Sequence, residues 1–328
     1  MLIAVDAMGG DHAPAEPVRG ASVAARELGI EIALVGPPAV LEAELARQGL
    51  QPDGLRIVPA EEVIGMDESP AQAVRQKRRS SIHEALRLVK SGQAAAFVSA
   101  GNTGAVMAAA LMVLGRLGNI ERPALGGLYP FSEHGVLMLD VGANADCKPS
   151  YLVQFAYMGS IYVEKMFGLG RPRVGLFNIG EEEGKGNELV REVYDLLRET
   201  DLNFVGNVEA KEVARGHVDV VVTDGFTGNV AMKMSEGIAE FIMRELRAAI
   251  SSRPHYVLAA GLLRGAFQNL RRRLDYAEYG GVPLLGVNGV VVIGHGRSSA
   301  TAIKNAIRSA HQEATSGVLE ALRAALKR

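Results

Sequence analysis

Short apolar runs alternate with longer amphipathic runs along most of the 328-residue chain. The short runs have the length of buried strands and the longer runs have helical spacing, which is the pattern of successive β–α–β units. The sequence therefore predicts an α/β fold with a mainly parallel sheet. The expected strands cover residues 3–5, 31–35, 55–58, 94–98, 135–139, 173–177, 203–208, 218–222 and 289–293. The expected helices cover residues 14–28, 38–48, 71–91, 106–114, 149–167, 188–199, 230–250 and 298–327, the last as one helix or as a pair.

Six of the expected strands end in glycine together with Asp, Asn, Thr, Ser or His. These ends lie at residues 6–11, 99–105, 140–144, 178–187, 223–229 and 294–299. In open α/β sheets, ligands bind outside the carboxyl ends of the strands. We therefore expect all six ends to line one polar cleft.

The turn at Ser99–Ala105 joins a predicted strand to an alanine-rich helix. The first N–H groups of a helix lack intrahelical partners, and together with the helix dipole they attract an anion. Gly101 and Gly104 allow the backbone to come close to that anion, while Asn102 and Thr103 add side-chain hydrogen bonds. Taken alone, the same residues fit an N-capped helix without a ligand equally well.

Composition narrows the function further. The formal net charge of −2 gives no reason to expect nucleic acid. Cys147 is the only cysteine, which excludes an internal disulfide and a cysteine-based zinc site and fits a reducing cytoplasm. We expect neither a signal peptide nor a membrane-spanning segment. No dinucleotide fingerprint, zinc-binding His-Glu-x-x-His or hydrolase Gly-x-Ser-x-Gly is present, so we expect no cofactor, no metal and no serine nucleophile.

Three further stretches carry charge or exposed apolar character. Lys185 lies between two glycines in a loop that departs from the P-loop pattern, and it is either a turn lysine or a cation for the cleft. The basic cluster Arg75, Lys77, Arg78 and Arg79 is either a solvated helix face or a dock for an acidic partner. Residues 236–277 are expected to form an inserted helical element.

The inserted element contains an apolar stretch at residues 255–267, which basic residues flank on both sides. This stretch fits a core helix, a dimer contact or an amphipathic element on an anionic membrane. We find no interdomain linker elsewhere, so residues 1–328 are expected to form a single α/β domain, either undivided or as two lobes around a cleft.

Several long motifs, in order from residue 1 to about residue 308, resemble the PlsX family of bacterial phosphate acyltransferases. The motifs are Asp6-Ala-Met-Gly-Gly-Asp11, Ser99-Ala-Gly-Asn-Thr-Gly-Ala105, Asp140-Val-Gly-Ala-Asn144, Thr223-Asp-Gly-Phe-Thr-Gly-Asn-Val230 and Tyr279-Gly-Gly-Val-Pro-Leu-Leu-Gly286. The resemblance implies a Rossmann-like three-layer fold similar to phosphotransacetylase and the isocitrate/isopropylmalate dehydrogenases. It also implies a homodimer that transfers a long fatty acyl group from acyl carrier protein to inorganic phosphate. The product, acyl phosphate, would feed the acylation of glycerol 3-phosphate in phospholipid synthesis.

On this basis we predict roles for individual residues. Lys185 would neutralise charge on phosphate or on the tetrahedral intermediate, and Asp224 and Asn229 would orient phosphate or the thioester. His295 would protonate the departing thiolate, unless it only caps its own turn. The residues expected to bind phosphate or substrate, or to shape the floor of the site, are Asp6, Gly9, Gly10, Asp11, Ser99, Gly101, Asn102, Thr103, Gly104, Asp140, Asn144 and Gly225.

The resemblance also implies partners. Acyl carrier protein is acidic, so either the Arg75–Arg79 cluster or Arg271, Arg272 and Arg273 would dock it. The family attaches peripherally to membranes, which assigns membrane contact at the inner face to the apolar tip Val257, Leu258, Leu262, Leu263 and Phe267. A glycerol-3-phosphate acyltransferase would take the product. The alternatives are a phosphotransacetylase that uses acyl-CoA, a dehydrogenase of the related fold, and a membrane-associated scaffold without catalysis.

Overall fold

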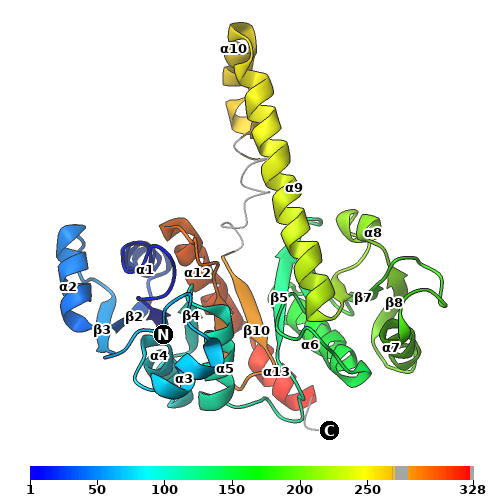
Figure 1. The fold of residues 1–328 in the computed structure, drawn as a ribbon, viewed down its shortest axis with the longest axis horizontal. Helices are drawn as coiled ribbons and strands as arrows, with labels where there is room; N and C mark the ends of the chain where they lie inside the picture. The colour runs from blue at the N-terminus through cyan, green and yellow to red at the C-terminus, as the bar shows by residue number, and fades with distance from the viewer. Residues whose placement is uncertain (268, 270–279, 326–328) are drawn as a thin grey trace.

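The computed structural model describes residues 1–267, 269 and 280–325. The chain forms an α/β structure around one 11-stranded sheet (Figure 1). In spatial order the strands are β3 (Leu55–Pro59), β2 (Glu31–Gly36), β1 (Leu2–Asp6), β4 (Ala96–Ser99), β11 (Val290–Ile293), β10 (Val282–Leu285), β5 (Ala124–Tyr129), β6 (Val136–Leu139), β9 (Val220–Val222), β7 (Arg173–Phe177) and β8 (Asn203–Val208).

Helices cover both faces of the sheet because alternate strand residues bury their side chains on opposite sides. Around β1, one face packs against α1 (Ala15–Leu28), α2 (Pro38–Arg47) and α12 (Ala300–Ser316). The other face packs against α3 (Pro70–Gln76), α4 (Ser81–Lys90) and α5 (Thr103–Val113). The second half of the sheet is covered by α6 (Pro149–Phe167), α7 (Glu188–Arg198) and α13 (Val318–Ala325) on one face. The short helix α8 (Ala210–Ala214) and the start of α9 (Gly225–Ser251) lie on the other face.

The middle of the sheet reverses the direction of the strands. β5 and β10 were not expected from the sequence, and each runs antiparallel to both of its neighbours. As a result, β6, β9, β7 and β8 run opposite to β1, β4 and β11. The six strand ends therefore fall into two sets of opposite direction, and a single cleft lined by all six stays a prediction.

Two of the expected helices have other boundaries in the structure, and one alternative is resolved. The single helix predicted over 71–91 is wrong, since α3 ends at Gln76 and α4 begins at Ser81. The long helix begins at Gly225 instead of residue 230, because the Asp224 side chain caps it. The C-terminal pair of helices is confirmed, and Gly317, with a φ of 78°, separates them.

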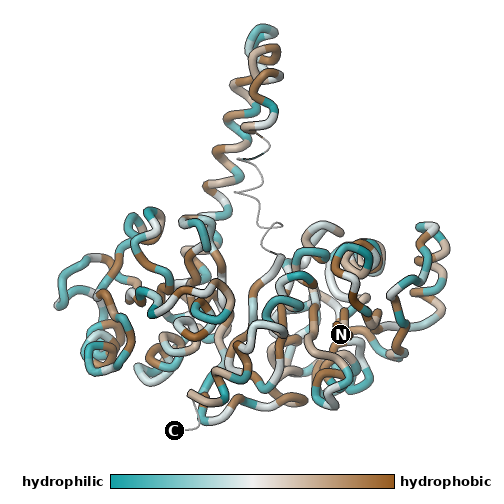
Figure 2. Tube along the Cα trace, turned by 180° about the vertical axis from the view of Figure 1, so that it is seen from behind, coloured by the Kyte–Doolittle hydropathy of each residue, from teal (hydrophilic) through white to brown (hydrophobic). Residues whose placement is uncertain are grey.

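A helical arm extends away from the sheet (Figure 1). It consists of the far end of α9 and of α10 (Pro254–Leu262), which packs against α9. Figure 2 shows many apolar residues along this arm. None of the helices in the described part of the chain is long and apolar enough to cross a membrane.

Candidate active site

In the first set of strand ends, a buried network around Asp6 joins the end of β1 to the end of β4. The Ser99 hydroxyl donates to Asp6 Oδ2 over 2.7 Å, and it accepts the Gly101 N–H over 3.0 Å. The Met8 N–H donates to Asp6 Oδ1 over 3.1 Å. Burial raises the pKa of Asp6, and hydrogen bonds from Ser99 and Met8 act in the opposite direction. Asp6 therefore orients Ser99, which in turn fixes the Gly101 backbone.

Gly9 is required by this network. A Cβ atom at residue 9 would lie 2.5 Å from Asp6 Oδ2 and 2.7 Å from the Gly101 nitrogen. Real Cβ atoms do not approach other heavy atoms so closely, so any larger residue would push the two strand ends apart. Gly9 therefore lies beside Gly101, and its expected role in binding phosphate or substrate stays a prediction.

Asn102 has a different contact set from the one we expected. Its Oδ1 accepts the Ala105 N–H and caps α5, while its Nδ2 donates to the carbonyl oxygens of Met66 and Glu68. Both amide hydrogens are used, so the side chain holds the 66–68 loop against the turn. For the backbone N–H groups of Asn102, Thr103 and Gly104 we find no acceptor among residues 1–267 and 280–325. The donors available to an anion here are the backbone N–H groups.

The loop after β11 completes the first set. The Asp11 N–H donates to Gly296 O over 2.8 Å, and Gly10 has a φ of 105° that favours glycine. The Arg297 N–H donates to His295 Nδ1 over 3.2 Å. Nδ1 is thus an acceptor, and in the neutral ring the proton lies on Nε2. This bond inside the turn also agrees with the capping role that the sequence left open.

Helix α9 brings two further charges to His295. Lys233 and Glu236 form an ion pair of 3.0 Å on one face of this helix. Burial is the largest cause of the lowered pKa of His295, and Lys233 lowers it further while Glu236 raises it. His295 is therefore neutral near pH 7 and can act as a hydrogen-bond donor through Nε2. Sequence analysis missed both residues, although their i, i+3 spacing beyond Asp224 places them on one helix face.

The second set of strand ends surrounds Asp140, whose carboxylate is saturated. Oδ1 accepts the N–H groups of Leu125, Gly142 and Ala143 over 2.9 to 3.1 Å. Oδ2 accepts the Asn144 N–H over 2.8 Å and Asn144 Nδ2 over 2.9 Å. Burial raises the pKa of Asp140, and these bonds partly offset the rise. Asp140 and Asn144 therefore serve the local structure.

The start of α9 is built into the same region. Asp224 caps the helix by accepting the Thr227 N–H over 2.8 Å and the Thr227 hydroxyl over 2.7 Å. Asn229 Nδ2 donates to Val141 O over 2.9 Å. The Gly225 N–H donates to Asn144 O over 2.8 Å. The Asp224 carboxylate, Asn229 Nδ2 and the Gly225 N–H thus have structural partners.

Two further residues are Lys185, in the loop after β7, and Cys147, whose thiol donates to Asn144 O over 3.5 Å beside the second set. Lys185 is exposed, and no hydrogen bond or ion pair joins it to the Ser99–Ala105 turn within the described ranges. Its predicted role therefore stays a prediction.

Burial raises the pKa of the Cys147 thiol to about 11, so a thiolate nucleophile is disfavoured at neutral pH.

The basic cluster does not form one uniform surface. Lys77 Nζ binds Glu68 Oε1 over 2.5 Å and Val63 O over 2.7 Å, so it holds a loop in place. Arg79 pairs with Glu61 over 2.7 Å, whereas Arg75 and Arg78 are exposed. The alternative cluster Arg271, Arg272 and Arg273 lies outside the described residues.

Comparisons with known proteins agree with this architecture. Residues 1–321 match the model of a family described as fatty acid synthesis protein. A phosphate acyltransferase of Heliobacterium modesticaldum is 54% identical over 314 residues, covering 95% of this chain and 93% of the relative. A phosphate acyltransferase of Trichlorobacter lovleyi is 51% identical over 324 residues, covering 98% of this chain and 93% of that relative.

Solved structures show the same fold at low identity. A phosphotransacetylase from Streptococcus pyogenes has a TM-score of 0.64 at 18% identity and covers 95% of this chain and 94% of its own. A branched-chain phosphotransacylase from Enterococcus faecalis V583 has a TM-score of 0.60 at 14% identity and covers 96% and 99%. The expected fold class and family resemblance are confirmed. The chain belongs to the fatty acid synthesis protein family, together with the phosphate acyltransferases it resembles at about half of all positions.

Proposed function

We propose that this chain transfers a long fatty acyl group from the thioester of acyl carrier protein to inorganic phosphate. The observation that carries the proposal is the turn at residues 101–104, where backbone N–H donors lie beside the Asp6–Ser99 network. Backbone donors at a helix start bind phosphate without a metal, and they keep their positions as charge develops. Membership of the family of phosphate acyltransferases supports the same reaction.

The reaction needs little covalent help from the protein. A phosphate oxygen held at the 101–104 turn attacks the thioester carbonyl, and a C–O bond forms as the C–S bond breaks. The departing thiolate takes its proton from water, and the Nε2–H of the neutral His295 ring stabilises the thiolate by a hydrogen bond. Positioning and stabilisation of the oxyanion then supply most of the rate.

The first test combines the purified protein with palmitoyl acyl carrier protein and inorganic phosphate. We expect acyl phosphate by mass spectrometry, and no product when phosphate is omitted. Acetyl-CoA is the control substrate. Efficient turnover of acetyl-CoA with none of the carrier-bound substrate would contradict the proposal in favour of a phosphotransacetylase. Folded protein that turns over neither substrate would favour a scaffold without catalysis.

We keep Lys185 as a mobile cation for the transition state, on the basis of its exposed position in a glycine-flanked loop. Lys185→Ala should lower kcat and leave the unfolding midpoint unchanged. Asp224 and Asn229 act from the anchored start of α9, so their substitution should lower stability as well as turnover. Wild-type kinetics for Lys185→Ala would remove this residue from the mechanism.

We propose that Arg75 and Arg79 dock the acidic carrier protein, since both are exposed next to the loop that Asn102 holds. The double variant Arg75→Glu/Arg79→Glu should raise KM for the carrier-bound substrate and weaken its salt dependence. Arg191→Glu on α7 is the matched control. If only Arg272→Glu raises this KM, the dock lies at residues 271–273 instead.

The arm carries two exposed apolar surfaces. Along α9, every fourth side chain or so forms a stripe of exposed hydrophobic residues: Phe226, Val230, Met234, Ile238, Phe241 and Ile242. We propose that this stripe packs against a second copy of the chain, because a stripe of this length is rarely left in water. Sedimentation should show a dimer that Ile238→Glu weakens. A wild-type monomer at all concentrations would contradict this assignment.

At the tip, Leu258 is 76% exposed and Leu262 is 88% exposed, with Val257 and Leu263 beside them. We propose that this surface inserts into the inner face of the cell membrane, where the acyl phosphate passes to a glycerol-3-phosphate acyltransferase. Leu258→Ser/Leu262→Ser should reduce cosedimentation with vesicles containing phosphatidylglycerol and leave soluble turnover intact. Unchanged vesicle binding would restrict the tip to a role in the dimer.

A further inference from the structure

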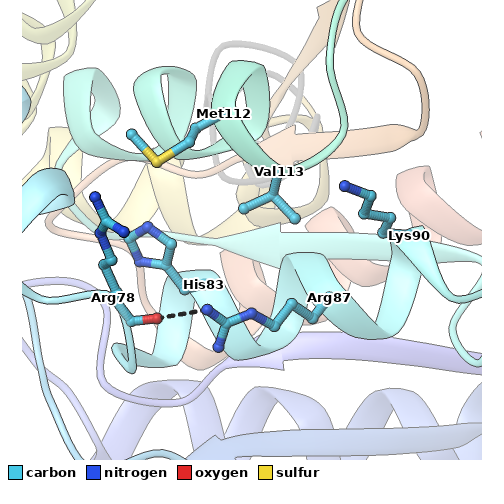
Figure 3. A pocket seen from close by; sticks show the side chains of 6 residues that line it. All are labelled: Arg78, His83, Arg87, Lys90, Met112 and Val113. Carbon is cyan, nitrogen blue, oxygen red and sulfur yellow. Dashed lines mark hydrogen bonds between the residues drawn. The ribbon is translucent and has the colours of Figure 1, made fainter.

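A cavity of about 650 Å³ opens between α4 and α5, away from the residues assigned to acyl transfer (Figure 3). This volume lies within the range of natural small-molecule sites. The residues that line it are Arg78, His83, Arg87, Lys90, Met112 and Val113. Cationic and imidazole side chains thus face a short apolar wall, and none of the described residues that line the cavity is a carboxylate.

The positive charge of the cavity is only partly compensated. Arg87 pairs with Glu84 and donates to Arg78 O over 2.9 Å, which fixes the guanidinium at the rim. Neither Arg78 nor Lys90 pairs with a carboxylate within the described residues. Arg78, Arg87 and Lys90 thus outnumber the two nearby carboxylates, Glu84 on Arg87 and Glu62 acting on His83, and the cavity attracts a negatively charged ligand.

His83 supplies a buried ring nitrogen, Nε2, for which no partner is found among the described residues. The side chain is 2% exposed, and Nδ1 lies 2.8 Å from Ser80 Oγ. Ser80 Oγ accepts the His83 N–H, which leaves its hydroxyl hydrogen available to Nδ1, and with that bond the ring proton is assigned to Nε2. Burial and the charge of Arg87 lower the pKa of His83, which keeps the ring neutral.

The Nε2 atom has no hydrogen-bond partner in the described part of the chain. Figure 3 shows the ring between Arg78 and Met112, facing the cavity. Buried polar atoms are almost always paired in folded proteins, so an orphan donor beside cations indicates a missing anionic acceptor. Met112 is 50% exposed and lies next to this donor, which favours a ligand with an organic part over a bare ion.

We propose that this cavity is a second oxyanion site, which binds the phosphate group of an organic phosphate ester. His83 Nε2–H, Arg78 and Lys90 contact the phosphate oxygens, and the organic chain lies on Met112 and Val113. Met112 follows Thr103 by nine residues on α5, which corresponds to about 14 Å along the helix, so the cavity is separate from the 101–104 turn. The proposal does not depend on the acyl transfer reaction.

Two sources share this ligand chemistry, namely the phosphopantetheine arm of an acyl carrier and the phosphate headgroup of a lipid. The experiment titrates pantetheine 4′-phosphate, dodecyl phosphate below its micelle concentration, and inorganic phosphate into protein labelled with ¹⁵N-histidine. The readouts are the His83 Nε2 resonance and calorimetric Kd values. We expect one organic phosphate to shift this resonance and to bind at least tenfold more tightly than inorganic phosphate.

Each outcome decides the question. A shift with pantetheine 4′-phosphate alone supports the site and identifies the carrier arm, whereas a shift with dodecyl phosphate supports it and identifies a lipid headgroup. Equal binding of inorganic phosphate, or no shift of the His83 resonance with any probe, overturns the proposal.

Variants test the contacts. Lys90→Ala and Met112→Glu are both at exposed positions, and each should raise the Kd of the organic phosphate at least tenfold, while Arg191→Ala should leave it unchanged. His83→Gln should also raise the Kd of the organic phosphate at least tenfold, provided that its unfolding midpoint shows that it is folded. Wild-type affinity in Lys90→Ala and in Met112→Glu would overturn the proposal even if His83→Gln does not fold.

Discussion

The turn at residues 101–104 and the turn at residues 140–144 both follow short, fully buried strands, yet their hydrogen bonds differ in kind. Around Asp140, five N–H groups converge on one carboxylate, and the neighbouring start of α9 is tied into the same region. Around Ser99, one hydroxyl organises the backbone and the following N–H groups remain available. A glycine-rich polar strand end can thus be an anchor, whose N–H groups are bonded within the protein, or a binding site, whose N–H groups are left for a ligand. Assigning a partner to each donor and acceptor distinguishes the two cases.

Among substitutions at the 140–144 turn and the start of α9, we expect one at Gly228 to destabilise the protein most. A Cβ atom there would lie 1.9 Å from Asp140 O, where no side chain can move aside. We expect Gly228→Ala to lower the free energy of unfolding by at least about 3 kcal/mol, measured by urea denaturation. Gly237→Ala on the same helix is the control, since a Cβ there meets nothing within 4 Å and should be neutral or stabilising. Equal stability of the two variants would contradict the anchor.

Glu313 and Asp140 are both buried carboxyl groups, but among the residues that the structure describes Glu313 lacks the N–H donors that surround Asp140. Its Oε2 has no partner within the described ranges, and burial raises its pKa from 4.5 to about 8. The folded state therefore binds a proton that the unfolded state releases, so stability falls as the pH rises from 4.5 to about 8. We expect Glu313→Gln to stabilise the protein by about 3 kcal/mol at pH 7.

The gain from Glu313→Gln should shrink as the pH approaches 4.5, where both states of the wild-type protein hold the proton. Thermal unfolding from pH 4.5 to 9 measures this dependence. A gain independent of pH would mean that packing, and not the carboxyl proton, causes the effect.

Asp140→Asn tests the saturated carboxylate directly. The amide keeps one acceptor oxygen and turns an NH₂ group towards backbone N–H donors, which leaves buried donors unpaired. We expect a loss of about 2 kcal/mol in the free energy of unfolding. The kcat per folded molecule should fall less than in Ser99→Ala. The reverse order of the two kcat values would place Asp140 in the chemistry.

Ser99→Ala tests the open turn. The variant removes both the acceptor for the Gly101 N–H and the donor to Asp6. We expect KM for inorganic phosphate to rise about tenfold, which corresponds to the loss of one hydrogen bond, with about 1 kcal/mol less stability. Ser91→Ala, at an exposed helix end, is the matched control. An unchanged KM would separate the turn from phosphate.

Much of the fold followed from the hydrophobic pattern, and the failures have physical causes. The segment Ala124–Tyr129 contains two glycines, and Val282–Leu285 contains a proline, so both read poorly as strands. They nevertheless lie in the middle of the sheet, where neighbouring strands supply the burial. Because they were missed, the reversal of strand direction could not be predicted.

The sequence indicated which polar residues lie at the strand ends, but it did not show which of them are helix caps and which are free to bind a ligand. Asn102, Asp224 and Ser80 are all helix caps, and capping uses the same short polar residues as ligand binding. A sequence cannot show that both amide hydrogens of Asn102 are used, because Met66 and Glu68 lie more than 30 residues away. The sequence also cannot show that Lys233 acts on His295, because this effect depends on where α9 lies relative to the loop after β11.

The helix α9 is held at one end and extends far beyond the body at the other, which makes it a lever. Residues 228–251 span about 35 Å at 1.5 Å per residue, whereas Lys233 lies only about 8 Å from Gly228. A pivot of about 5° at the fixed end moves the tip by about 3 Å but moves Lys233 by less than about 1 Å. The short arm of the lever lies beside His295 and the long arm ends at the tip. The tip can therefore follow an uneven surface while the charges beside His295 stay nearly still.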